Sequence, residues 1–137
     1  MQSRQETPKQ VLLDLSAMTD CLDGDPGAAD LVEKALSGEI AVTISTLTAL
    51  RLWQTQVEDR HSEIRVVALL KLVNQLPVTE DYVRIARQIR STTGYSLRSW
   101  EEAMLSINVA ISQDLGLTVC SRDARIYQGH GCETIEY

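Results

Sequence analysis

The chain has 137 residues, of which 44% are hydrophobic and 23% are charged, and its formal net charge is -6. This length and composition predict one folded domain with a packed core, and they exclude an intrinsically disordered chain. The chain has 19 Asp and Glu residues but 13 Lys and Arg residues. This acidic surplus disfavours passive binding to nucleic-acid phosphates, but it allows an enzyme that reaches phosphates through a metal ion. No apolar run is long enough to cross a membrane, so we expect a cytoplasmic protein. Three widely spaced cysteines predict reduced, buried thiols.

The first part of the chain predicts a strand, a turn and a helix. A polar tail over residues 1–10 precedes an apolar strand over 11–13, which ends at Asp14. Residues 20–26, rich in Asp and Gly, predict a turn, and a helix follows over about 26–37. Asp14 is therefore expected at the carboxyl end of a buried strand.

The remaining chain continues this alternation of strands and helices. The expected elements are a strand over 40–44, a helix that includes 47–53, a helix around 64–73, a short strand over 76–78, a helix over 79–90, a polar loop over 91–99, a helix over 100–115, a strand over 117–120 and an edge strand over 132–136. Alternating strands and helices of these lengths predict an α/β sandwich with a small, mostly parallel sheet.

Two acids follow predicted strands in the same way. Asp14 ends the first strand, and Asp123 comes just after the strand over 117–120. Ligand crevices in parallel α/β sheets lie outside the carboxyl ends of the strands, which would bring these two acids into one cleft. Mg²⁺ and Mn²⁺ prefer such oxygen ligands. The alternative is that each acid is only a turn or cap residue.

Several segments, taken in order, resemble a PIN domain of the VapC toxin type. They are residues 11–16 (VLLDLS), 22–28 (LDGDPGA), 44–48 (ISTLT), 76–79 (LPVT) and 115–124 (LGLTVCSRDA). The resemblance implies a single PIN-like domain over 11–137 with an α/β/α fold. It also implies a ribonuclease that gathers three or four acids around Mg²⁺ or Mn²⁺ and hydrolyses RNA. The toxin members of that family are neutralised by a cognate antitoxin protein.

The resemblance carries over unevenly to the individual site residues. Asp14 matches the first acid of the family and Ser16 the hydroxyl or amide two residues later, while Asp123 matches the last acid and Ser121 the hydroxyl before it. The second acid falls on Arg51, so a cation stands where the family has a ligand.

The position of the third acid has more than one solution. Counting forward from the loop glycine gives Glu101, the local pattern gives Glu102, and counting back from Gly116 gives Leu105. Because the outer two counts differ by about one helical turn, either the helix is extended at its start and a Glu replaces the usual Asp, or the third acid is missing.

These matches lead to two hypotheses of different classes. In the first, Asp14, Asp123 and either Glu101 or Glu102 hold the metal that activates a water, with Ser16 and Ser121 orienting the ligands. In the second, the domain is catalytically inactive and serves as an RNA-associated or protein-interaction module.

Arg51 separates these hypotheses, because a fixed positive charge next to a divalent ion opposes its binding. The guanidinium would instead neutralise Asp14 and close the cleft, or it would contact an RNA phosphate.

Two tryptophans and an apolar helix face bear on possible partners. Trp53 and Trp100 suit packing in the core or an interface better than base stacking in an RNA groove. We expect a homodimer, for which the apolar patch would consist of Leu52, Trp53, Val66, Val67 and Leu70.

Overall fold

The computed structural model describes residues 7–89 and 99–137. Most of the expected tail over 1–10 and of the expected loop over 91–99 lies outside these residues. The elements in chain order are β1 (Lys9–Leu13), α1 (Leu15–Asp23), α2 (Pro26–Leu36), β2 (Ile40–Ser45), α3 (Thr46–Gln56), α4 (Arg60–Leu70), β3 (Asn74–Leu76), α5 (Glu80–Arg87), α6 (Trp100–Leu115), β4 (Thr118–Cys120), α7 (Ala124–Gly129) and β5 (Thr134–Ile135).

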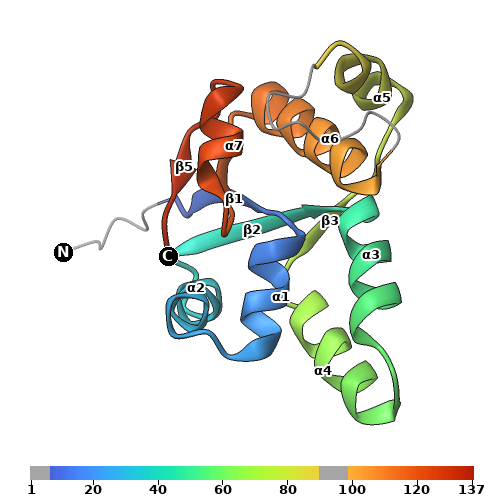
Figure 1. Cartoon of the computed structure of the whole chain (residues 1–137). Helices are drawn as coiled ribbons and strands as arrows, with labels where there is room; N and C mark the ends of the chain where they lie inside the picture. Colours follow the sequence, from blue (N-terminus) through green and yellow to red (C-terminus); the bar gives the residue numbers. More distant parts are fainter. Residues whose placement is uncertain (1–6, 90–98) are drawn as a thin grey trace, which may run out of the picture.

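The central sheet has five strands in the order β3-β2-β1-β4-β5, and every pair of neighbours is parallel. Leu12 pairs with Thr43 of β2 on one side and with Val119 of β4 on the other. Helices cover both faces of this sheet (Figure 1). The expected α/β/α sandwich with a small parallel sheet is confirmed.

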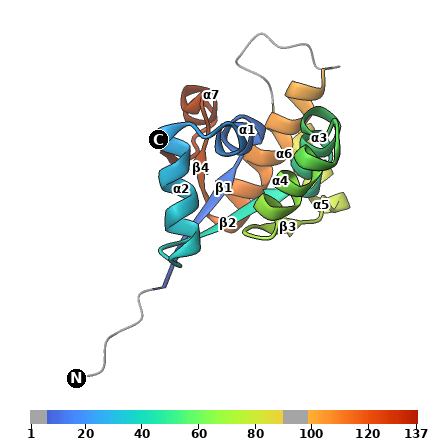
Figure 2. The same cartoon turned by 90° about the horizontal axis from the view of Figure 1, so that it is seen from below.

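Alternating residues of β1 divide the core into two clusters, one on each face of the sheet. Val11 and Leu13 pack with residues of α1, α2, α3 and α4, whereas Leu12 packs with residues of α5, α6 and α7. Figure 2 views the molecule from the side of α1 to α4, with α6 behind the strands. The two-residue period of a strand and burial of both faces explain why β1 reads as an uninterrupted apolar run.

The structure contains two helices that the sequence interpretation missed. The turn expected over 20–26 is shorter, because α1 continues to Asp23 and ends at Gly24 with a left-handed backbone. Asp14 caps this helix, and Ala17, Met18 and Leu22 give it a buried face. Helix α7 follows Asp123, where we expected only the connection to an edge strand.

Several element boundaries also differ from the expected ones. Strand β1 begins at Lys9, inside the expected polar tail. Strand β3 ends at Leu76, because Pro77 lacks the backbone N–H that would continue a ladder. Helix α5 ends at Arg87 and β5 spans only Thr134–Ile135, at the expected sheet edge.

The cysteines are free thiols in the structure. Cys120 and Cys132 are buried, and Cys21 is half-buried. Burial is the main cause that raises the pKa of Cys21 and of Cys120 to about 11, so both stay protonated at neutral pH. This chemistry suits packing better than nucleophilic attack.

Among the described helices, none is long and apolar enough to cross a membrane.

Candidate active site

The site is built at the carboxyl edge of the sheet, where β1 and β4 lie side by side. Asp14 follows β1 and begins α1, and its backbone N–H donates to the carbonyl of Cys120 at the end of β4 at 3.3 Å. Ser121 follows β4 directly. Strand β1 is the central strand, with β2 on one side and β4 on the other. Asp14 and Ser121 therefore lie at the carboxyl edge, where parallel sheets form their ligand crevices.

The Asp14 carboxylate accepts four hydrogen bonds. Its Oδ1 accepts from the Ser16 hydroxyl at 2.7 Å and the Ala17 backbone N–H at 3.0 Å. Its Oδ2 accepts from the Ser121 hydroxyl at 2.6 Å and the Tyr127 hydroxyl at 3.2 Å. An ionised carboxylate offers about four lone-pair sites, so the protein itself fills the acceptor capacity of Asp14.

Two of these donors are themselves held by the backbone. The Ser16 hydroxyl accepts from the Arg122 N–H at 3.0 Å, and the Ser121 hydroxyl accepts from the Asp123 N–H at 3.1 Å. The two hydroxyl oxygens lie 3.3 Å apart. Ser16 and Ser121 therefore orient the Asp14 carboxylate through their hydroxyls, and they do so from two different strand ends.

Tyr127 and Asn108 complete this group, and the sequence interpretation found neither. Both side chains are buried, and the Asn108 Nδ2 donates to the Tyr127 hydroxyl at 3.3 Å. Burial first, and then the charge of Asp14, raises the pKa of the Tyr127 phenol well above its ordinary value, so the phenol keeps its proton. Because α7 was not expected, nothing in the sequence indicated that Tyr127 would face Asp14.

A cleft of about 340 Å³ opens above this group. We call Asp14, Ser16, Ser121, Tyr127 and Asn108 its floor. Residues of α1, α6 and α7 form its sides: Leu15, Thr19, Glu101, Met104, Leu105 and Ile126, with Arg122 and Asp123 after β4. Three carboxylates, those of Asp14, Glu101 and Asp123, thus line one cleft.

The register of α6 separates the candidates for the third acid. Glu101, Leu105 and Asn108 lie on one helix face at spacings of four and three residues, and all three line the cleft. Glu102 is rotated by about 100° from Glu101, and it lies outside the cleft lining with only 3% of its surface exposed. The structure therefore brings Glu101, and not Glu102, to Asp14 and Asp123.

Glu102 is an unusual buried acid. Its backbone N–H donates to the Ser99 hydroxyl that caps α6, but neither carboxylate oxygen has a hydrogen-bond partner in the described part of the chain. A buried carboxylate without partners costs folding free energy. Its proposed role as a metal ligand finds no support in this position.

Arg51 does not pair with Asp14. Both residues are described, and the ion pairs of residues 7–89 and 99–137 do not include this one. The Arg51 guanidinium lies 5.9 Å from the centre of the Trp100 ring, within cation–π distance, and donates to Gln54 at 3.1 Å. The cleft is therefore not closed by Arg51, which packs against the first residue of α6.

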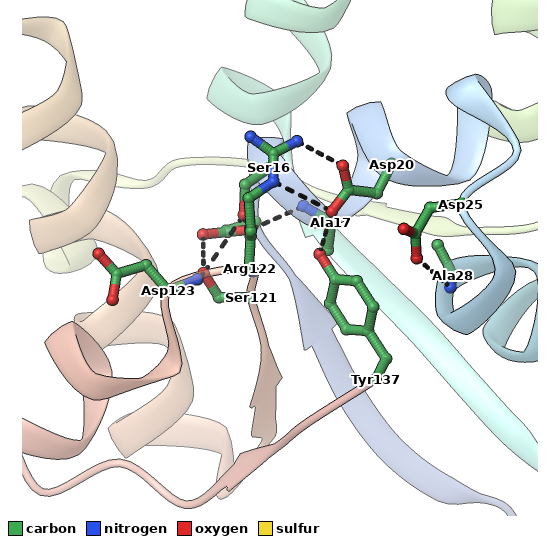
Figure 3. A network of polar contacts seen from close by, with 10 residues as sticks. Ser16, Ala17, Asp20, Asp25, Ala28, Ser121, Arg122, Asp123 and Tyr137 are labelled. Atoms are coloured by element: carbon green, nitrogen blue, oxygen red, sulfur yellow. Dashed lines mark hydrogen bonds and ion pairs between the residues drawn. The ribbon is translucent and has the colours of Figure 1, made fainter.

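Arg122 pairs with Asp20 instead, beside the cleft. Its Nε lies 3.2 Å from an Asp20 oxygen, and the Tyr137 hydroxyl donates to the same carboxylate at 2.6 Å. Figure 3 shows Arg122 and Tyr137 meeting at Asp20, while Asp123 points away from them. The hydrogen bond from Arg122 is the main cause that lowers the pKa of Asp20.

The donor set suits Mg²⁺ or Mn²⁺ in kind but is not gathered around one point. Three carboxylates line the cleft, and the buried Oδ1 of Asn108 has no partner among the described residues. In the same part of the chain, no group of three or more His, Cys, Asp and Glu side chains converges to hold an ion. Four donors already occupy the Asp14 carboxylate, so a cation that binds Asp14 would have to displace one of them.

The arrangement of elements matches known structures far better than the sequence does. No protein-family model matches the chain, and no curated protein matches its sequence. By structure, the chain is similar to VapBC2 from Rickettsia felis, bound to a DNA fragment from its promoter, with a TM-score of 0.72 and 9% identity over 93% of this chain and 98% of that one.

Two further neighbours have the same character. VapBC from Salmonella typhimurium, bound to DNA, gives a TM-score of 0.67 at 15% identity over 94% and 98% of the two chains. FitAcB from Neisseria gonorrhoeae gives 0.65 at 21% identity over 91% and 96%. At these identities the comparison establishes the fold: this chain has the PIN-domain fold of the VapC and FitB toxins.

Proposed function

We propose that the protein is a toxin-type PIN-domain ribonuclease that binds RNA in the cleft above Asp14. The observation that carries this proposal is that Asp14, Glu101 and Asp123 all line one cleft at the carboxyl edge of the sheet. Those three acids come from three separate parts of the chain, a strand end, a helix start and a second strand end. Such a shared location suits a phosphodiester-cleaving site better than three unrelated cap residues.

Each residue of the cleft has a role in this proposal. A bound Mg²⁺ or Mn²⁺, held by Asp14, Glu101 and Asp123, would supply an activated water and neutralise the phosphate charge. Ser16 and Ser121 hold the Asp14 carboxylate in a fixed orientation through their hydroxyls. Leu15, Met104, Leu105 and Ile126 are the apolar part of the cleft lining.

Arg51 is the residue that we propose for contact with RNA outside the cleft. Its guanidinium lies over Trp100, which is 49% exposed and precedes Glu101 on α6. A guanidinium offers a planar fork of donors to phosphate oxygens. An RNA strand that leaves the cleft past Glu101 would meet this pair.

A second candidate is an inactive PIN-like domain that serves as an interaction module. Its specific support is that Asp14 already has four hydrogen-bond donors, while Arg51 stands at the position of the second acid and, by one of the three counts, Leu105 stands at that of the third. In that case the floor is a structural unit that keeps two strand ends together without a metal.

Calorimetric titration of Mg²⁺ and Mn²⁺, followed by incubation with a mixed RNA, distinguishes the two candidates. The variants are Asp123→Asn and, as a matched control, Asp81→Asn, which changes an exposed acid on α5 that does not line the cleft. Saturable binding and metal-dependent cleavage that vanish in Asp123→Asn but persist in Asp81→Asn support the nuclease. No binding at millimolar metal and no cleavage by the native chain support the inactive module.

We also propose two protein partners, a cognate antitoxin and a second copy of this chain. The antitoxin rests on the fold, because a similar structure from Klebsiella pneumoniae is a toxin-antitoxin complex.

The expected dimer patch needs revision, because Leu52, Val66 and Leu70 lie in the core. Trp53 of the expected patch is exposed, and the exposed Leu50 and Ile64 on α3 and α4 would replace the buried residues. Light scattering of the native chain and of Trp53→Lys tests the dimer, which the variant should dissociate.

A further inference from the structure

The Tyr127 hydroxyl occupies a position that a cation ligand would need. We propose that Tyr127, oriented by Asn108, is a positioning residue that blocks the last acceptor site of Asp14 and thereby weakens divalent-cation binding in the cleft. This inference deepens the proposed function and rests on its metal site. The supporting observations are the hydrogen bonds and the burial of the floor residues.

Of the four donors to Asp14, Tyr127 is the least constrained by the backbone. The Ala17 N–H belongs to the first turn of α1 and cannot leave without breaking the cap. Ser16 and Ser121 each accept a backbone N–H while donating to Asp14. The Tyr127 bond is also the longest of the four, at 3.2 Å.

The direction of the Asn108 contact fixes what the Tyr127 hydroxyl does. Tyr127 carries one proton and donates it to the Asp14 carboxylate, so its oxygen must accept from its other neighbour. The amide of Asn108 therefore faces Tyr127 with Nδ2, at 3.3 Å. Its Oδ1 is left buried and without a partner among the described residues.

The burial of this pair makes the block persistent. Asn108 is 1% exposed and Tyr127 is 4% exposed, and Tyr127 packs in the cluster between the sheet and α6. Close packing restricts rotation of the ring away from Asp14. Cation binding at Oδ2 must therefore displace a hydroxyl that is carried by a buried, closely packed ring.

The decisive experiment is a Mn²⁺ titration of Tyr127→Phe, followed by the electron paramagnetic resonance of free Mn²⁺. Phenylalanine keeps the ring in the core and removes only the hydroxyl. We expect Mn²⁺ to bind about tenfold more tightly than to the native chain. A variant that merely damaged the site would lose affinity, so an increase cannot arise from a purely structural role.

Tyr82→Phe is the matched control. Tyr82 is also buried and donates its hydroxyl to an aspartate, Asp114, at 2.9 Å, but on α5 and outside the cleft. We expect no change in Mn²⁺ affinity for this variant. Asn108→Leu should raise the affinity by less than Tyr127→Phe, because the hydroxyl stays but loses its orienting neighbour.

The outcomes separate this inference from the proposed function. If the native chain and Tyr127→Phe bind Mn²⁺ equally well, the inference is wrong and the metal site stands. If Tyr127→Phe binds more weakly, Tyr127 helps binding and the inference is also wrong. If neither chain binds Mn²⁺, both the inference and the metal-dependent part of the proposed function fall.

Discussion

Asp14 and Glu102 are two carboxylates of the same domain in opposite situations. Asp14 accepts four hydrogen bonds on the cleft floor. Glu102, in the first turn of α6, is buried to 3% exposure and accepts none from the described residues. The Asp14 carboxylate is therefore fully hydrogen-bonded by the protein, whereas the buried Glu102 carboxyl has no hydrogen-bond partner among the described residues, which costs folding free energy.

The difference shows which part of the site is fixed and which part varies. The floor joins the ends of β1 and β4 through hydroxyls and backbone N–H groups, so its geometry follows from the sheet itself. On α6, the direction of each acidic side chain depends only on its position around the helix axis. One residue further along the chain, the carboxylate therefore lies in the interior and not in the cleft.

The largest expected effect comes from removing the acceptor at the centre of the floor. Asp14→Ala deletes the α1 cap and leaves buried hydroxyls without an acceptor, so it should lower the free energy of unfolding by about 2–4 kcal/mol. Asp123→Ala is the comparison, because that exposed side chain makes no capping hydrogen bond and should change stability by less than about 0.5 kcal/mol. Urea unfolding measures both, and equal losses would contradict the distinction.

A second prediction adds an acid to the α6 side. Leu105→Asp places a carboxylate on the cleft face, and it should tighten Mn²⁺ binding about tenfold while lowering the free energy of unfolding by about 2 kcal/mol, because a core leucine is lost. Leu105→Asn has a similar shape without the charge. It should show the same stability loss in urea with unchanged Mn²⁺ affinity, and a gain in both variants would refute the role of the charge.

A third prediction replaces the buried carboxyl of Glu102, which has no hydrogen-bond partner among the described residues. Glu102→Gln should raise the free energy of unfolding by about 1 kcal/mol, because a neutral amide costs less to bury than a carboxylate. Glu101→Gln, at the neighbouring exposed position, should leave stability unchanged but weaken Mn²⁺ binding. Thermal unfolding of the two variants side by side checks this, and a destabilised Glu102→Gln would mean that the charged form is paired.

The smallest effect concerns Asp20, beside the cleft. Its pKa is lower in the folded chain than the ordinary 3.8, so it contributes stability above that pH that is lost as the pH falls through the lowered value. Asp20→Asn should cost about 0.5–1 kcal/mol at neutral pH, since Arg122 is largely exposed. Urea unfolding at neutral pH and at about pH 3 should show the difference shrinking, and a constant difference would contradict it.

The sequence predicted the sheet better than the helices around the site. The apolar runs that precede Asp14 and Ser121 predict buried strands, because both faces of a central parallel strand are covered. Helices α1 and α7 were missed, since their buried faces are short and their sequences contain turn-forming residues. Because α7 was missed, Tyr127 could not be connected with Asp14, and Asn108, on the predicted helix over 100–115, is linked to Asp14 through its hydrogen bond to Tyr127.

By itself, the sequence determined the order of the strands and of most helices, the position of Asp14 and Asp123 after strands, and the cation at position 51. These are local properties, carried by hydrophobic period and residue type. Only the tertiary structure decided that Glu101 and not Glu102 faces the cleft, that Arg51 packs on Trp100, and that Tyr127 fills the last acceptor of Asp14. Helix rotation and long-range packing decide such contacts, and neither is encoded in the spacing of neighbouring residues.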